Sequence, residues 1–286
     1  MPRPIDHLVL AVRDLDAARA AYERLGFTLT PVARHPFGTA NSLAQFDGNF
    51  LELLAIDDAE KIPAATTETF SFGAFNRDFL SDNEGLSMLV LKSADPAGDR
   101  TDFAAHELRT YEPFRFERVA KGPDGAEHKV AFSLTFTGDS RLKRPGFFTC
   151  QHHYLENFWR PEFQRHANGA LGIASMVMVS RDPADFHEFL THFTGQHEML
   201  ATSLGVEIDL GEGTQIEVLS PVAFKAFFGE ETATDPRRFL AWRVRVADLG
   251  KTGEMLASNG VSFAEIAGAL VVPSAEACGA ALAFIA

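Results

Sequence analysis

The hydrophobic and polar positions of this chain repeat the same order four times. Each copy has an apolar run, then an Asp, then an amphipathic segment, and the apolar runs cover residues 5–12, 86–91, 173–179 and 239–246. Such a run fits a buried strand, and the Asp that follows is a favoured helix N-cap. The repeat predicts a modular sheet, with function located between the modules.

The first unit shows the pattern most clearly. Asp14 is expected to cap a helix whose apolar residues recur at helical spacing as far as Leu25, and Gly26 ends it. Three short strands are then predicted at residues 27–33, 41–46 and 50–56. The order of this unit is β-α-β-β-β.

The second unit repeats that order after an expected loop at residues 57–84. Its helix is predicted at 95–108, and its later strands at 114–120, 128–137 and 146–152. The residues Gly122-Pro123-Asp124-Gly125 are a strong turn signal between the first two of these strands.

The second half of the chain contains two further units. The third has a helix at 183–194 and a last strand at 215–219, and the fourth has a helix at 249–258 and strands at 261–266, 269–273 and 280–285. The fold class is therefore α+β, with four βαβββ modules in two pairs. The pairs are expected at residues 1–153 and 171–286, joined by a connector at 154–170.

Composition and charge narrow the class of protein. The net charge of −13 opposes binding to nucleic acid, and no apolar run is long enough to span a bilayer or to act as a signal peptide, so a cytoplasmic location is expected. Cys150 and Cys278 form no metal or disulfide motif and are expected to be buried thiols. The 26 Phe residues, several of them in the expected loop around 69–76, indicate an apolar pocket, although core packing is their more common use.

Several motifs together resemble one known group of proteins. These motifs are Asp6-His7-Leu8-Val9 with Asp14-Leu15, the loop from His35 to Asn41, Phe50-Leu51-Glu52-Leu53, and Cys150-Gln151-His152-His153 followed by Trp159, Gln164, His166, Asn168 and Gly169. With the paired βαβββ modules, they are similar to the glyoxalase-like subgroup of the vicinal oxygen chelate superfamily. The resemblance covers nearly the whole chain and implies that each pair of modules forms a curved, mixed-sheet cup with helices outside.

The resemblance also implies one divalent metal, Zn, Mn, Ni, Co or Fe, which acts as a Lewis acid on adjacent substrate oxygens. His7 and Glu52 stand at the superfamily's ligand positions on the first and last strands of the first module. His152, at the end of the last strand of the second module, is the third candidate ligand. Neighbouring strand residues point to opposite faces, so at most one of His152 and His153 faces the cup.

Each ligand candidate also has an ordinary structural explanation. His7 interrupts an apolar strand, where a hydrogen-bonded core histidine is the alternative. Glu52 lies among apolar residues, where the alternative is a salt bridge or a place on the exposed face of the sheet. His152 could be a surface residue at a strand end.

Five further residues are candidates for substrate binding. His35, Thr39 and Asn41 could hydrogen-bond a polar substrate group, although Thr and Asn also satisfy turns. Arg77 could anchor a carboxylate, with a solvated surface arginine as the alternative. His166 could line the site or only stabilise a turn.

The second half departs from this ligand pattern, because Ser175 aligns with His7 although Glu217 aligns with Glu52. The expected function is a glyoxalase-like metal enzyme of lyase or isomerase type, which acts on a small oxygenated organic substrate, with Glu52 moving a proton. The alternatives are an Fe(II) ring-cleaving dioxygenase of the same superfamily and a metal-free protein that sequesters an apolar ligand. Motifs of serine hydrolases, P-loop proteins and Rossmann domains are absent, and the sequence leaves a homodimer open.

Overall fold

Two eight-stranded mixed sheets of the same topology make up the protein. The computed structural model describes residues 2–121 and 127–286, so the predicted turn at 122–125 lies outside the described residues. The strands run in the order β2-β3-β4-β1-β5-β8-β7-β6 in the first sheet and β10-β11-β12-β9-β13-β16-β15-β14 in the second. The central pair is antiparallel in both sheets, and each of its strands has a parallel neighbour on its other side. The α+β class and the four βαβββ modules are confirmed.

The elements have these bounds in the structure. The strands of the first sheet are β1 Ile5–Ala11, β2 Ala33–Arg34, β3 Thr39–Gln45, β4 Phe50–Ile56, β5 Gly85–Lys92, β6 Phe114–Lys121, β7 Glu127–Thr137 and β8 Gly146–His152. Those of the second sheet are β9 Ala170–Val179, β10 Leu200–Ala201, β11 Gly205–Gly211, β12 Thr214–Leu219, β13 Arg238–Val246, β14 Ala264–Ile266, β15 Ala269–Val272 and β16 Ala281–Ile285. The α-helices are α1 Leu15–Arg24, α2 Phe72–Asp82, α3 Pro96–Ala105, α4 Leu155–Phe158, α5 His187–Thr194, α6 Pro221–Phe228 and α7 Leu249–Ser258.

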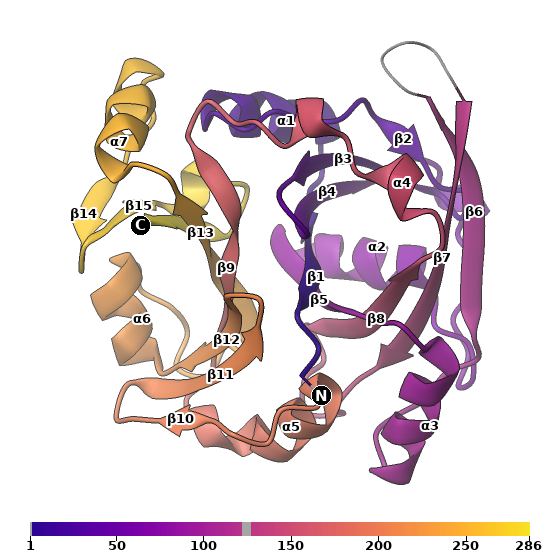
Figure 1. Cartoon of the computed structure of the whole chain (residues 1–286). Helices are drawn as coiled ribbons and strands as arrows, with labels where there is room; N and C mark the ends of the chain where they lie inside the picture. Colours follow the sequence, from indigo (N-terminus) through magenta and orange to yellow (C-terminus); the bar gives the residue numbers. More distant parts are fainter. Residues whose placement is uncertain (1, 122–126) are drawn as a thin grey trace.

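Each sheet curls into a half-open cup, and the two cups stand side by side with their central strands facing each other (Figure 1). One large apolar core fills the space between the sheets and includes residues of α1, α3, α5 and α7. A second core lies in the first cup and a third in the second cup. The alternation of β1 explains this division, because Leu8 and Leu10 belong to the shared core while Val9 belongs to the first cup.

Helices α2 and α6 are not among the predicted elements. The segment predicted as a loop at 57–84 contains α2, whose Phe72 packs in the first cup, and α6 places Phe224 and Phe228 in the second. Ser71 and Ser220 cap these helices. Both helices are short and bury one side inside a cup, so tertiary packing stabilises them more than their own sequence pattern does.

The strand predicted at 27–33 is mostly irregular, and only Ala33–Arg34 forms a strand. Phe27 and Leu29 are buried in the shared core, which explains the apolar pattern without a ladder. Pro31 has no N–H to donate, and Thr30 instead bonds to the backbone of Leu43 through its own N–H and its hydroxyl.

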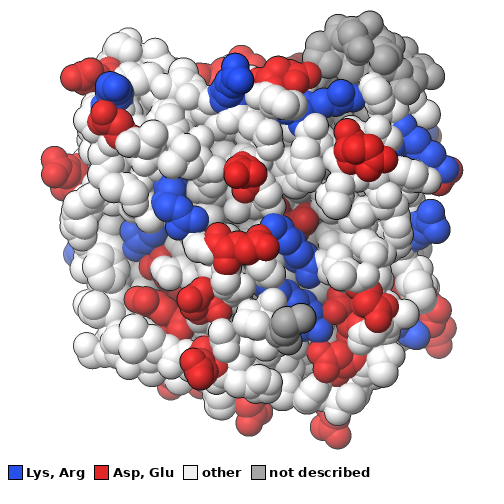
Figure 2. Space-filling view, in the orientation of Figure 1, with Lys and Arg blue, Asp and Glu red and all other residues white. Residues whose placement is uncertain are grey.

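The face of the protein shown in Figure 2 carries acidic and basic side chains that are interspersed. Within the described part of the chain, every helix is too short or too polar to cross a membrane.

Candidate active site

A buried row of polar side chains crosses the inner surface of the first cup. His7 and Glu52 come from the neighbouring strands β1 and β4, and each is about 5% exposed. The Nε2 atom of His7 lies 3.8 Å from Oε2 of Glu52. The structure therefore brings together the two candidate ligands of the first module.

Asp6 extends this row because β1 is irregular at this point. The pairing of β1 with β5 shifts between Ile5 and His7, which is the signature of a β-bulge with Asp6 as the extra residue. Asp6 and His7 then turn to the same side of the sheet, where Nδ1 of His7 lies 2.6 Å from Oδ1 of Asp6. Sequence reasoning missed Asp6 as a site residue, although a carboxylate inside an apolar strand was the available signal.

His152 reaches the same carboxylate from β8. Its Nε2 atom lies 3.2 Å from Asp6, whereas His153 turns away and bonds to Ser133. Burial alone would raise the pKa of Asp6, but the charge and hydrogen bond of His152 and those of His7 outweigh it and hold that pKa well below its usual value. Asp6 is therefore an ionised acceptor that orients both imidazoles.

This arrangement fixes the tautomers of the two histidines. An ionised carboxylate only accepts, so His7 donates from Nδ1 and its Nε2 lone pair faces Glu52. By the same argument His152 donates from Nε2, and its buried Nδ1 has no hydrogen-bond partner among the described residues. In its neutral form, each imidazole therefore keeps one lone pair that takes no part in a hydrogen bond with the described residues.

Asn41, His35 and Thr39 form the other end of the row. Asn41 donates from Nδ2 to Glu52 over 2.5 Å and also lies 3.3 Å from Nε2 of His35, whose Nδ1 is 2.8 Å from the Thr39 hydroxyl. Burial raises the pKa of Glu52 above its ordinary value, against the opposing effects of His7 and Asn41. Three of the five substrate-binding candidates therefore form a hydrogen-bonded chain that starts at Glu52, and two of them, His35 and Asn41, line the cavity.

The other two candidates lie elsewhere. Arg77 is exposed on α2 and pairs with its neighbour Asp78. His166 accepts from the backbone N–H of Thr28 and donates to the carbonyl of Gln45, so both of its ring nitrogens hold the connector against the first sheet. Neither residue lines the cavity of the cup.

The polar row opens on a small cavity of about 40 Å³, which has room for roughly three water molecules. His7, His35, Asn41 and Glu52 line it together with Cys150 and Arg118. The rest of its wall is mainly aromatic, with Phe37, Phe50, Phe72, Phe116, Phe132, Phe148 and Phe158. The abundant Phe residues therefore do surround a pocket, and a low-dielectric wall of this kind strengthens electrostatic interactions inside it.

The donor atoms fit a divalent metal in their chemistry. Within residues 2–121 and 127–286, one group of three metal-ligating side chains has its donor atoms all within 4.8 Å of one another, and it consists of Asp6, Cys150 and His152. Burial raises the pKa of the Cys150 thiol, as do the nearby charges of Asp6 and Glu52. Carboxylate, imidazole and thiol donors suit Zn and other borderline divalent ions. His7 and Glu52 lie outside this group, and the nitrogens of His7 and His152 that make no hydrogen bond to the described residues are consistent with a bound metal.

The second cup lacks such a row. Ser175 pairs with Gln215 as His7 pairs with Phe50, and Glu217 takes the position of Glu52. Glu217, however, accepts from Nε of Arg243 over 2.8 Å, from Nη2 over 3.2 Å, and from the Ser175 hydroxyl. A side-chain cation already neutralises the carboxylate in this cup.

Two curled sheets of paired βαβββ modules, with a buried His and Glu on neighbouring strands, agree with the fold and ligand positions implied by the resemblance to the vicinal oxygen chelate superfamily. The sequence profile of the glyoxalase-like domain family matches residues 5–194, well over half of the chain. The chain belongs to this glyoxalase-like domain family, which confirms the resemblance noted from the motifs.

Solved structures share the fold at low sequence identity. A hypothetical protein from Staphylococcus aureus has a TM-score of 0.68 and 13% identity, over 98% of both chains. A mutant of 4-hydroxymandelate synthase from Streptomyces coelicolor has a TM-score of 0.59 and 8% identity, over 99% of this chain and 92% of that one. A xylose isomerase-like TIM barrel/4-hydroxyphenylpyruvate dioxygenase fusion protein has a TM-score of 0.54 and 14% identity, over 93% of this chain and 40% of that one. No curated protein matches the sequence.

One prediction concerns the acid stability that His35 controls. Burial, and then the charge of Arg118, lower the pKa of His35 to about 3, so it stays neutral in the folded chain while the unfolded chain protonates it below about pH 6.5. Stability is therefore lost as the pH falls through this window, by up to about 4 kcal/mol from this residue. In His35→Gln, the free energy of unfolding from urea titrations should depend less on pH between 6.5 and 3.

The matched control is His197→Gln, since His197 is exposed. This variant should keep the pH dependence of the wild type. Parallel curves for His35→Gln and wild type would contradict the assignment.

Proposed function

We propose that the chain is a divalent-metal enzyme of lyase or isomerase type, which acts on a small oxygenated organic substrate in the first cup. The observation that carries this proposal is the pair formed by the free Nε2 of His7 and the carboxylate of Glu52, 3.8 Å apart in the wall of an aromatic cavity. His7, Glu52 and His152 would hold the metal, and Asp6 would orient both imidazoles, a common arrangement around metal ligands. A bound metal supplies Lewis-acid stabilisation of negative charge on substrate oxygens.

Glu52 is the residue proposed to move a proton. Burial raises its pKa toward the working range of a general acid or base, and the hydrogen bond from Asn41 to Oε1 leaves Oε2 directed at His7. His35 is neutral and accepts from the Asn41 amide, so it positions the amide that donates to Glu52. The phenylalanine rings limit the water near the transferred proton.

Metal analysis tests the proposal. Protein purified without chelators should contain about one Zn, Mn, Ni or Co per chain by mass spectrometry, as expected for a catalytic site. His7→Ala and Glu52→Ala should each lose most of this metal. The matched control is Ser175→Ala, which removes the side chain at the equivalent position of the second cup and should retain the metal.

Other outcomes identify the alternatives. Stoichiometric iron with oxygen consumption would favour the ring-cleaving dioxygenase, and protein without metal would favour sequestration of an apolar ligand in the aromatic cavity. Unchanged metal content in both the His7 and the Glu52 variants would place the metal elsewhere. A cytoplasmic location and the absence of a nucleic-acid partner stay predictions from the sequence.

A further inference from the structure

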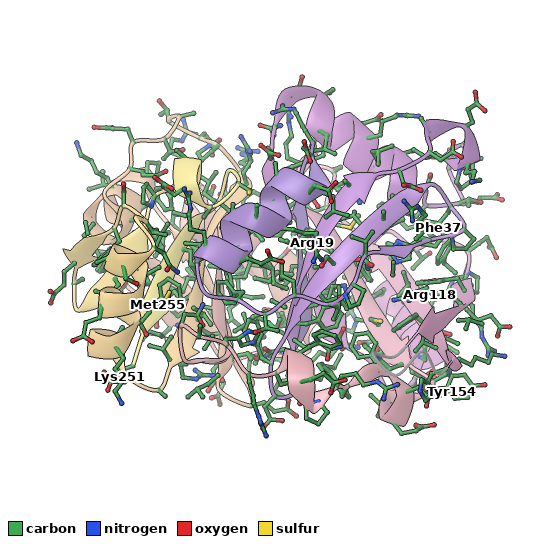
Figure 3. The ribbon with its side chains drawn as sticks, turned by 90° about the horizontal axis from the view of Figure 1, so that it is seen from above. Arg19, Phe37, Arg118, Tyr154, Lys251 and Met255 are labelled. Atoms are coloured by element: carbon green, nitrogen blue, oxygen red, sulfur yellow. The ribbon has the colours of Figure 1, made fainter. Side chains whose placement is uncertain are left out.

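A second hollow lies directly outside the cavity of the first cup. It has a volume of about 450 Å³ and lies between the edge strands β2 and β6, with residues of α4 and the connector on its third side. Leu43, Arg118 and Phe158 line both spaces. Arg118 is therefore part of the partition between the inner cavity and the outer hollow, and Figure 3 shows it with Phe37 on the side of the first sheet.

The outer hollow is positively charged in an acidic protein. Arg34, Arg118 and Arg160 line it, and no Asp or Glu is among the described residues that do so, although the chain has a net charge of −13. Arg34 already pairs with Asp57 outside the hollow. Arg118 is half-buried, and its Nε has no hydrogen-bond partner among the described residues.

The position of Arg118 on β6 explains its direction. Phe114, Phe116 and Arg118 alternate along the strand and share one face, and Phe116 and Arg118 both line the inner cavity. A guanidinium on this aromatic face has lost water without gaining a full set of partners, which is costly unless a ligand supplies them.

We propose that Arg118 binds the carboxylate of the substrate, which makes the substrate a small organic acid with an apolar body. This inference rests on the proposed function, because it takes the inner cavity as the reaction site. The carboxylate stays at the partition, where the guanidinium offers two parallel N–H groups, and the apolar body extends among the phenylalanine rings toward Glu52 and His7.

One charged probe and one neutral probe of the same shape test this assignment. Propionate and propionamide, whose ethyl group is small enough for a cavity with room for roughly three water molecules, are titrated into the purified protein, with binding followed by calorimetry. The wild type should bind the acid about 10-fold or more tightly than the amide, since a charge-assisted pair is lost in the amide. Arg118→Met should remove this preference, Arg118→Lys should keep part of it, and the control Arg34→Met should keep all of it.

The lysine variant separates substrate binding from a structural role of Arg118. Burial lowers the pKa of Arg118, and the charge of the nearby Glu52 opposes this effect. If Arg118 were only a counter-ion for Glu52, Arg118→Lys, which keeps the charge but not the two parallel N–H groups, would keep the whole preference for the acid, and that result would overturn the proposal. Binding of neither probe by the wild type, or an undiminished preference in Arg118→Met, would also overturn it.

Metal content measured on the same samples separates this inference from the proposed function. A preference for the acid that disappears in Arg118→Met supports the inference, whether or not the protein holds metal. Wild-type protein without metal contradicts the proposed enzyme alone. Metal-bearing wild type without a preference for the acid contradicts the inference alone.

Discussion

Replacing Arg243 with Met is expected to lower the free energy of unfolding by about 3–5 kcal/mol, because it leaves the Glu217 carboxylate buried without its cation. The side chains of Arg243 and Glu217 are 14% and 6% exposed, and two hydrogen bonds join them. The guanidinium also lies 4.8 Å from the centre of the Phe228 ring. Urea unfolding followed by circular dichroism measures the change.

The double variant with Arg243→Met and Glu217→Leu is the matched control. Replacing both members of a buried ion pair with apolar groups is often neutral, so the double variant should recover most of the stability lost in the single one. If both variants lost the same free energy, packing around Arg243 rather than the stranded charge would explain the loss. That outcome would contradict the view that an internal cation neutralises the second cup.

Replacing Asp6 with Ala is the second substitution with a large expected effect. It should lower the free energy of unfolding by about 2–5 kcal/mol when a chelator is present. Both His7 and His152 lose their acceptor, and the two ring N–H groups are left in a buried place. Urea titrations of wild type and variant measure the difference. The control Asp78→Ala removes an exposed carboxylate and should change stability by less than about 0.5 kcal/mol.

The pH dependence provides a further check on Asp6. A carboxyl group whose pKa is lowered in the folded state contributes stability above its unfolded pKa of about 4, and this contribution is lost as the pH falls below that value. The difference between wild type and Asp6→Ala should therefore shrink below about pH 4. A constant difference across this range would show that the ionised carboxylate is not the stabilising form.

The sequence was sufficient to predict the modules, because each central strand is a long apolar run followed by a capping Asp. The predicted bounds of β8 and α7 agree with the structure. Helices α2 and α6 could not be predicted in this way, since they are stabilised by the inside of a cup that the repeat pattern does not describe.

The candidate site was partly predictable for a similar reason. His7 and Glu52 interrupt apolar strands at positions where simple alternation along the strand predicts that their side chains face the first cup. Asp6 is on that side only because of a bulge, which has no clear signal in one sequence. Arg118 was missed although Phe114 and Phe116 mark its face as apolar, because alternation was used to locate β6 but not to follow its inner face.

The connector has a mechanical consequence for the whole molecule. Gln164 and His166 bind to the carbonyls of Phe46 and Gln45 at the end of β3, and Asn168 binds to Leu25 at the end of α1. Two residues later the chain enters β9, the central strand of the second sheet. Because the connector is tethered to the first cup directly before β9 begins, we expect a displacement of the wall of the first cup to shift the central strands of the second sheet.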